Sequence, residues 1–306
     1  MSVPLHQLPE QQPSVWQPTS VEEAMHLKHK WGDDSVLISG GTWLRTRWEN
    51  GVSPLPQHLI SLGRIPALSR LTMNAGGQVH IGPALCLADL MGNELMRQRC
   101  SLLVQACSEI AAPSVRNLAS IGGNVVTRTG DLIPVLLVMD AQVVCSDGQN
   151  ERVLALNEWL ESPISTPYEV MTAIVVPTAE QVDLDEDSNY EFYLKVGRRE
   201  AFTPSVVTVA GRLTLRADGK IEAIALAAGG GSAVPARFKD LEAAAIGQPL
   251  SKGLLQFLHK GVSAGFDAVA DDYAGVSYRK QTAANLIVSE CYRAWRKGGG
   301  ADAPRS

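Results

Sequence analysis

Residues 116–124 read Arg116-Asn117-Leu118-Ala119-Ser120-Ile121-Gly122-Gly123-Asn124, and a shorter stretch, Ile38-Ser39-Gly40-Gly41-Thr42, precedes them in the chain. Both stretches place a hydroxyl or amide side chain beside two consecutive glycines. Two glycines in a row allow a sharp turn that exposes backbone N–H groups, and converging N–H groups form an anion-binding nest. Two such turns in one chain suggest that one ligand is held from two sides, and a diphosphate is the first candidate.

Neither stretch is a standard nucleotide-binding motif. The first lacks the lysine of the P-loop pattern G-x-x-x-x-G-K-[ST], and both lack the G-x-G-x-x-G pattern of dinucleotide-binding folds. The alternative interpretation is an ordinary tight turn, which is favoured for either stretch taken alone. A third glycine run, Gly229-Gly230-Gly231, could be another anion-binding turn, but its place between a predicted strand and Pro235 favours a structural turn.

The composition of the 306-residue chain, with 45% hydrophobic residues and a net charge of −5, is that of a globular protein. No basic face is evident, which argues against a nucleic-acid partner. Five scattered cysteines argue against a disulfide framework, a zinc site or an iron–sulfur cluster, and they indicate a reducing compartment. Because the sequence shows neither a signal peptide nor a long apolar run, we expect a cytoplasmic protein without a membrane span.

The order of predicted elements divides the chain into two domains. We expect flexible tails at 1–14 and 297–306, and an acidic linker at 179–189 between domains at 15–178 and 190–296. The capping box Ser20-x-x-Glu23 predicts the start of a helix that runs to residue 31. Further helices are predicted at 43–49, 85–96, 102–110, 131–140, 236–246, 251–263 and 277–295, and strands at 36–38, 58–62, 78–81, 142–145, 153–156, 169–176, 190–196, 206–215 and 221–228.

Three further places could contact a ligand. Asp131 could accept a hydrogen bond from a ribose or ribityl hydroxyl, or could serve only as a helix N-cap. Lys195 is either the outward residue of a half-buried strand or a cation that faces a cleft. The run Arg198-Arg199-Glu200 is either a solvated loop or the border of a cofactor. The histidines are scattered and the H-E-x-x-H and G-x-S-x-G motifs are missing, so we predict no catalytic residue and no metal site.

These residues resemble the motifs of a known family, the FAD-binding medium subunits of the molybdenum hydroxylases, which include xanthine dehydrogenase and carbon monoxide dehydrogenase. The family signature R-N-x-A-[ST]-x-G-G-N is complete at 116–124, and the family's A-G-G-T turn is similar to Ser39-Gly40-Gly41-Thr42. The family's D-x-x-P motif is similar to Asp131-Leu132-Ile133-Pro134. Its F-x-K motif resembles Phe192-Tyr193-Leu194-Lys195, in which the lysine is displaced by one position, and its S-x-x-Y-R motif resembles Val276-Ser277-Tyr278-Arg279. The likeness covers about 15–295 and is closest to the bacterial xanthine dehydrogenases of purine catabolism.

The resemblance implies an α+β fold, with a two-lobed FAD-binding domain of the vanillyl-alcohol oxidase type and a small C-terminal domain that has a three-stranded antiparallel sheet and helices. It also implies which residues bind FAD. These are Val36, Leu37, Ile38, Ser39, Gly40, Gly41, Thr42 and Trp43 around the diphosphate, Ser120, Ile121, Gly122, Gly123 and Asn124 opposite them, and Ile110, Asp131, Met171 and Lys195 elsewhere along the cofactor. The chain departs from the family at Trp43, where relatives carry an acidic residue, and at Ile110, where they often carry an aromatic ring.

The activity that the resemblance implies is electron transfer. A molybdopterin-binding large subunit would oxidise the substrate, and a small subunit with two [2Fe–2S] clusters would pass electrons to FAD on this chain. NAD or another acceptor would then receive them. Two alternatives stay open: a stand-alone flavin oxidase, for which the C-terminal domain is short, and a non-redox nucleotide-binding module. The sequence identifies neither the substrate, nor the acceptor, nor the subunit stoichiometry.

Overall fold

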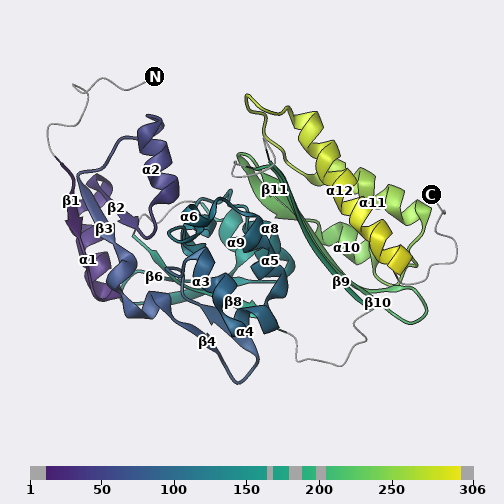
Figure 1. The fold of residues 1–306 in the computed structure, drawn as a ribbon, viewed down its shortest axis with the longest axis horizontal. Helices are drawn as coiled ribbons and strands as arrows, with labels where there is room; N and C mark the ends of the chain where they lie inside the picture. Colours follow the sequence, from purple (N-terminus) through teal and green to yellow (C-terminus); the bar gives the residue numbers. More distant parts are fainter. Residues whose placement is uncertain (1–11, 164–167, 179–187, 198–204, 298–306) are drawn as a thin grey trace.

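The computed structural model describes residues 12–163, 168–178, 188–197 and 205–297 (Figure 1). The N-terminal lobe contains a parallel sheet in the order β1-β3-β2, formed by Ser14–Trp16, His58–Ser61 and Ser35–Ile38. Its helices are α1 (Val21–Trp31), which packs on β2 and β3, and α2 (Thr42–Glu49), with short 3₁₀ helices at Gly32–Asp34, Leu62–Arg64 and Pro66–Ser69.

Two details of this lobe bear on the predictions. The predicted helix start is confirmed with Ser20 as the N-cap, because Ser20 Oγ accepts a hydrogen bond from Glu23 N at 3.1 Å, whereas the Glu23 carboxylate accepts from Thr19 N and not from Ser20 N. The predicted N-terminal tail is one residue too long, since Ser14 already belongs to β1 and pairs with His58. The first glycine stretch connects β2 directly to α2, so the lobe presents a strand, a glycine turn and a helix N-terminus in succession.

The second lobe is built on an antiparallel sheet in the order β4-β5-β8-β6-β7, formed by Leu71–Met73, Gln78–Ile81, Val170–Pro177, Gln142–Ser146 and Glu151–Ala155. Its helices are α3 (Leu87–Gly92), α4 (Glu94–Arg99), α5 (Ser101–Glu109), α6 (Pro113–Arg116), α7 (Ile121–Val126), α8 (Ile133–Val138) and α9 (Leu156–Glu161). The single helix predicted at 85–96 is wrong, because the chain breaks at Asn93. The Asn93 side chain accepts a hydrogen bond from Met96 N and caps a new helix.

The C-terminal domain has an antiparallel sheet in the order β12-β11-β10-β9, formed by Ala233–Arg237, Ile221–Gly230, Ser205–Leu215 and Asn189–Gly197. Its helices are α10 (Lys239–Ala245), α11 (Lys252–Gly265) and α12 (Val276–Lys297). The predicted three-stranded sheet is therefore one strand short. The fourth strand, β12, contains Pro235, which hides it from sequence patterns but is tolerated at a sheet edge. The helix predicted from 236 begins after this strand, at Lys239.

The C-terminal sheet lies between two sets of helices (Figure 1). One face packs against α11 and α12, and α8 of the second lobe packs on β10, β11 and β12 from the other side. The small side chains of Ala210, Ala225 and Ala227 belong to the core of the second lobe, together with Tyr193. Small residues allow α8 to approach the sheet closely, so this packing carries the ends of β9 and β10 to the loop that precedes α8.

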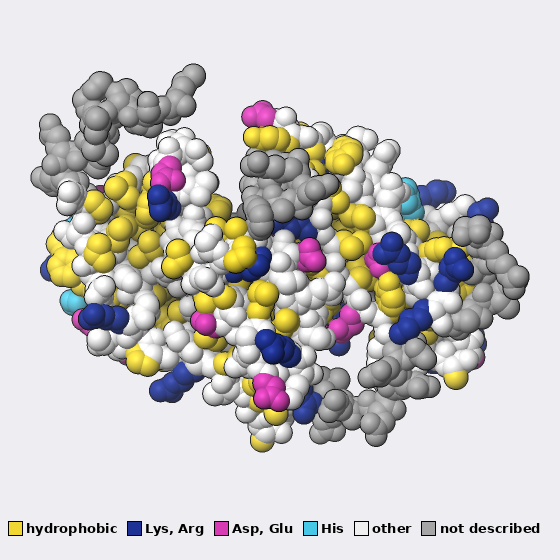
Figure 2. Space-filling view, viewed as in Figure 1, with side chains coloured by type: hydrophobic (Ala, Val, Ile, Leu, Met, Phe, Trp, Pro, Cys, Tyr) yellow, Lys and Arg dark blue, Asp and Glu magenta, His cyan; other side chains and the backbone are white. Residues whose placement is uncertain are grey.

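The predicted acidic linker falls largely at 179–187, outside the described residues, and Asn189 is already the first residue of β9. On the face shown in Figure 2, Lys and Arg side chains are interspersed with Asp and Glu side chains. Among the described helices, none combines the length and the apolar character that crossing a membrane requires.

Candidate functional site

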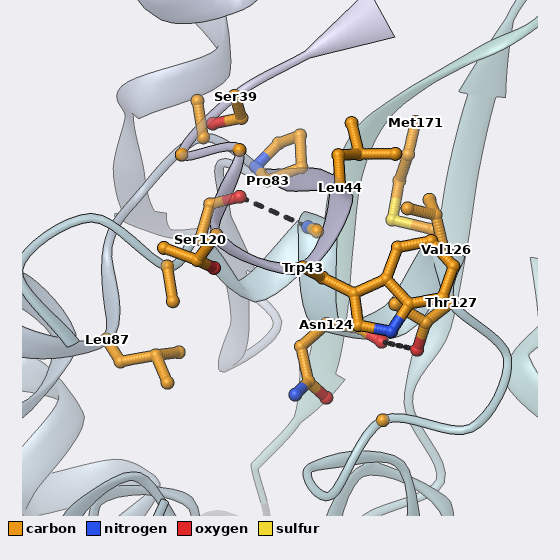
Figure 3. A pocket seen from close by; sticks show the side chains of 18 of the residues that line it. Ser39, Trp43, Leu44, Pro83, Leu87, Ser120, Asn124, Val126, Thr127 and Met171 are labelled. Carbon is orange, nitrogen blue, oxygen red and sulfur yellow. Dashed lines mark hydrogen bonds between the residues drawn. The ribbon is translucent and has the colours of Figure 1, made fainter. Parts of the chain in front are cut away.

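A cavity of about 690 Å³ is lined by residues of both lobes of the N-terminal domain and of the C-terminal domain. Figure 3 shows part of its N-terminal wall. Its wall is contributed by the first glycine stretch and α2, by the N-terminus of α7, by the loop before α8, and by β8, β9 and β10. Of the predicted site residues, all except Ile38 and Ile121 line this cavity. Ile121 is fully buried in the core, and Ile38 packs beneath Gly41, where a Cβ would come within 2.9 Å of the isoleucine Cδ1.

The first glycine stretch ends in a helix N-terminus that faces the cavity. Gly41 is the N-cap of α2 and has a φ of 66°, a left-handed conformation that favours glycine. The first hydrogen bond of the helix runs from Arg45 N to Gly41 O, so the N–H groups of Thr42 and Trp43 have no partner within α2. Gly41 has no side chain that could cap them. These N–H groups have no hydrogen-bond partner in the part of the chain that the structure describes, and together with the helix dipole they favour an anion at this place, as the sequence predicts.

The second glycine stretch has a different structure from the predicted turn. It forms the start of α7, with Ser120 as the N-cap. Its N–H groups are already paired: Ile121 donates to Leu85 O, Gly122 to Pro83 O, Gly123 to Ser120 Oγ and Asn124 to Ser120 O, at 2.9–3.1 Å. The prediction of a second nest of free N–H groups is therefore wrong. Gly122 is required for packing instead, because a Cβ there would lie 2.5 Å from Pro83 Cβ.

The two glycine stretches are nevertheless in direct contact. A Cβ on Gly40 would lie 1.7 Å from the carbonyl oxygen of Leu118, so only glycine permits this approach. The first residue of the second stretch shapes the cavity in another way. Arg116 Nη1 donates hydrogen bonds to the carbonyls of Ile110 and Ala111, at 3.0 and 2.6 Å. This contact stabilises a cavity wall in which Ala111 has a φ of 51°, rare for a residue with a Cβ.

An ion pair from two domains forms the polar end of the cavity. Lys195 Nζ on β9 lies 3.0 Å from Asp131 Oδ2, and both side chains are almost buried, at 10% and 15% exposure. Ser205 Oγ, at the start of β10, donates a short hydrogen bond to Asp131 Oδ1. The Tyr193 hydroxyl donates to Asp131 O at 3.3 Å, and burial, followed by the nearby Asp131 charge, raises the pKa of this tyrosine well above its usual value. Of the two interpretations of Lys195 that the sequence allows, the structure supports the one in which the lysine faces a cleft.

Asn124 links the second glycine stretch to this ion pair. Its Oδ1 accepts a hydrogen bond from Leu132 N at 3.1 Å, next to Asp131 in the chain. A Cβ on Gly130 would lie 2.2 Å from Asn124 O and Oδ1, so the loop before α8 is pressed against this asparagine. Asn124 therefore fixes the position from which Asp131 enters the cavity.

The apolar side chains differ in exposure. Ile110 and Met171 are buried, at 7% and 6% exposure, and line the cavity as predicted. Trp43 is 46% exposed and lines the cavity. In the view of Figure 3 its ring is drawn in front of Val126 and Thr127. The Arg47 guanidinium lies 4.7 Å from the Trp43 ring centroid, close enough for a cation–π interaction.

Sequence reasoning missed several residues of the wall. They include Pro83, Ala111, Val126, Thr127 and Ser205. Ser205 carries no local signal, because its contact with Asp131 joins residues 74 positions apart. The third glycine run is divided, with Gly229 and Gly230 in β11 and Gly231 at the cavity. The run Arg198-Arg199-Glu200 lies outside the described residues.

Two protein families match the chain in sequence. Residues 10–179 match the FAD-binding domain in molybdopterin dehydrogenase, and residues 192–295 match the carbon monoxide dehydrogenase flavoprotein C-terminal domain. Among curated proteins, the nicotinate dehydrogenase FAD-subunit of Eubacterium barkeri is 25% identical over 80% of this chain and 84% of its own length. The xanthine dehydrogenase FAD-binding subunit of Escherichia coli O157:H7 is 23% identical over 74% and 77%.

Solved structures give the same fold. A chain of carbon monoxide dehydrogenase from Hydrogenophaga pseudoflava superimposes with a TM-score of 0.84 at 23% identity, covering 95% of this chain and 99% of that one. The superposition covers both domains of this chain. The chain therefore belongs to the FAD-binding subunits of the molybdopterin dehydrogenases, the molybdenum hydroxylase family, and its cofactor is FAD.

Proposed function

We propose that this chain is the electron-transfer subunit of a molybdenum hydroxylase complex and that FAD occupies the cavity described above. The observation that carries the proposal is that one cavity joins the unpaired N–H groups of α2 to the Asp131–Lys195 ion pair. FAD has matching parts: a diphosphate, several hydroxyls and two largely apolar ring systems. Bound FAD supplies the chemistry, taking electrons from iron–sulfur clusters and passing them to NAD or another acceptor.

The chain's own residues have binding and orienting tasks in this proposal. The N-terminus of α2, with Ser39, Gly40 and Gly41, holds the diphosphate. Asp131 accepts a hydrogen bond from a cofactor hydroxyl, and the Lys195 ammonium attracts negative charge on the flavin side. Ile110 and Met171 exclude water from the ring systems.

The proposed partners are a molybdopterin-binding large subunit and a small subunit with two [2Fe–2S] clusters. In support, none of the five cysteines of this chain is in a disulfide, four of them are buried, and the described residues include no group of three or more His, Cys, Asp or Glu side chains that could hold a metal ion. The iron–sulfur clusters of the proposed complex are therefore assigned to another chain. Unpaired thiols also support the proposed cytoplasmic location.

FAD binding by the isolated chain is the first test. We expect FAD to stabilise the folded chain by about 2.7 kcal/mol at a hundredfold excess over Kd, and so to raise its unfolding temperature. We expect ADP to bind more weakly, because it fills only part of the cavity. Calorimetric titration with FAD, FMN and ADP measures both. Equal affinity for ADP and FAD would favour the non-redox module. Substrate turnover by the isolated chain would favour the stand-alone flavin oxidase.

We further propose xanthine as the substrate of the assembled complex. The support is the sequence resemblance and the relative named as a xanthine dehydrogenase subunit. In the complex purified without oxygen, xanthine is expected to bleach the flavin absorbance, and NAD is expected to restore it. Nicotinate and carbon monoxide are the matched comparisons, because other relatives are named for them. Bleaching by one of these and not by xanthine would contradict the substrate but leave the electron-transfer role intact.

A further inference from the structure

The carboxylate of Asp131 is held by the C-terminal domain although Asp131 itself belongs to the N-terminal domain. Lys195 Nζ contacts Oδ2 and Ser205 Oγ donates to Oδ1, so each carboxylate oxygen has its own partner. The main-chain oxygen of Asp131 also accepts a hydrogen bond, from Tyr193. Since Asp131, Lys195 and Ser205 all line the cavity, these contacts with the carboxylate lie at the surface that a cofactor would touch.

A β-bulge places Ser205 on the same face of the sheet as Lys195. Ser205 pairs with Gly197, and Thr208 pairs with Lys195, with a register shift between Ser205 and Val207. Paired residues point to the same face, and so do Lys195 and Gly197, which are two positions apart on one strand. Without the extra residue, Ser205 and Thr208 would point to opposite faces, because they are three positions apart. The bulge therefore directs the Ser205 hydroxyl to the cavity.

A buried arginine fixes the backbone of this bulge. Arg279 is fully buried, and its Nη1 donates a hydrogen bond to the carbonyl of Val206, the extra residue. Gly231 N donates to Ser205 O at 3.1 Å, and Gly231 lies so close to Arg279 that a Cβ would come within 2.1 Å of Nη1. The carbonyl groups of Ser205 and Val206 are thus held by contacts that do not involve the Ser205 hydroxyl. The hydroxyl itself is left for Asp131.

We propose that Ser205 is a positioning residue for FAD, an inference that rests on the proposed function. A carboxylate oxygen can accept more than one hydrogen bond. With one donor on each oxygen, Asp131 keeps acceptor capacity toward the cavity but has one fixed orientation. Ser205 sets that orientation and keeps the Lys195–Asp131 pair aligned, so the C-terminal domain determines how tightly the N-terminal domain holds the cofactor. Through the same alignment, Ser205 influences the flavin reduction potential.

The test compares Ser205→Ala, Ser205→Thr and Thr208→Val in the full chain. Thr208 is the matched control, because its hydroxyl is buried on the same strand and has no hydrogen-bond partner among the described residues. Loss of a hydrogen bond to a charged group predicts that Ser205→Ala weakens FAD binding about tenfold to a hundredfold. We expect Ser205→Thr to restore most of the affinity, and Thr208→Val to leave it unchanged.

Three readouts separate positioning from folding: the Kd for FAD, the flavin midpoint potential and the unfolding temperature of the apo chain. Ser205→Ala should change the first two, while the third, lowered by the lost hydrogen bond, should still show a chain that is fully folded at the assay temperature. Wild-type affinity and potential in Ser205→Ala, or an equal loss in Thr208→Val, would overturn this inference alone. A wild-type chain that does not bind FAD would overturn the proposed function and this inference together.

Discussion

Gly40→Ala is expected to abolish FAD binding and to destabilise the folded chain by about 3 kcal/mol or more. The added Cβ would lie 1.7 Å from the carbonyl oxygen of Leu118 and 2.5 Å from its carbon, and a backbone carbonyl cannot rotate away as a side chain can. The clash is relieved only if the first glycine stretch moves away from the second. That movement would displace the N-terminus of α2 from the cavity wall.

Chemical unfolding with and without excess FAD measures both parts of this expectation. Gly92→Ala is the matched control, because it lies at the end of α3, where a Cβ would meet nothing within 4 Å. Its unfolding free energy should stay within about 1 kcal/mol of wild type, since the local conformation tolerates alanine. A Gly40→Ala chain that gains as much stability from FAD as the wild type would contradict the proposed contact between the two stretches.

The predicted residues that line the cavity were named from the resemblance to a known family, and local patterns also indicated the first glycine stretch, Asp131 and Lys195. The first glycine stretch has glycines directly before a helix, and this order alone predicts unpaired N–H groups. The same reasoning failed at the second stretch, since the partners of Ile121 and Gly122 are the carbonyls of Leu85 and Pro83, far away in the chain. A glycine pair in sequence does not show whether its N–H groups are free or bonded to a distant carbonyl.

Other differences have equally specific causes. The break at Asn93 was visible in principle, because Gly92-Asn93-Glu94 combines a helix end with an N-cap residue. The contact between Ser205 and Asp131 could not be predicted from the sequence, because alternation along a strand assigns a residue to one face of the sheet only while the register is regular. A single bulge in β10 reverses that assignment.

Arg279→Met is expected to lower the free energy of unfolding by about 2–5 kcal/mol, because it leaves the carbonyls of Val206 and Ala274 without their donor and removes the ion partner of Asp271, which is 25% exposed. Arg279 is fully buried, its Nη2 lies 2.6 Å from Asp271 Oδ2, and its other nitrogens donate to the carbonyls of Val206 and Ala274. Methionine fills similar space but leaves these oxygens without their donor. Arg212→Met is the matched control, since Arg212 pairs with Glu191 at a more exposed place on the same sheet, and its loss should cost at most about 1 kcal/mol.

The Arg279 pair also predicts how stability depends on pH. Burial alone would raise the pKa of Asp271, but hydrogen bonds from Tyr273 N, from the Arg279 guanidinium and from Ala274 N bring it below its usual value of 3.8. A carboxyl group with a lowered pKa in the folded state stabilises the fold fully above 3.8, and this stabilisation is lost as the pH falls through the lower folded-state pKa. Asp271→Asn should therefore reduce stability at neutral pH and lose less of it on acidification than the wild type. Parallel acid-induced losses in the two chains, measured by urea unfolding at a series of pH values, would show that the charge of Asp271 does not hold Arg279 in place.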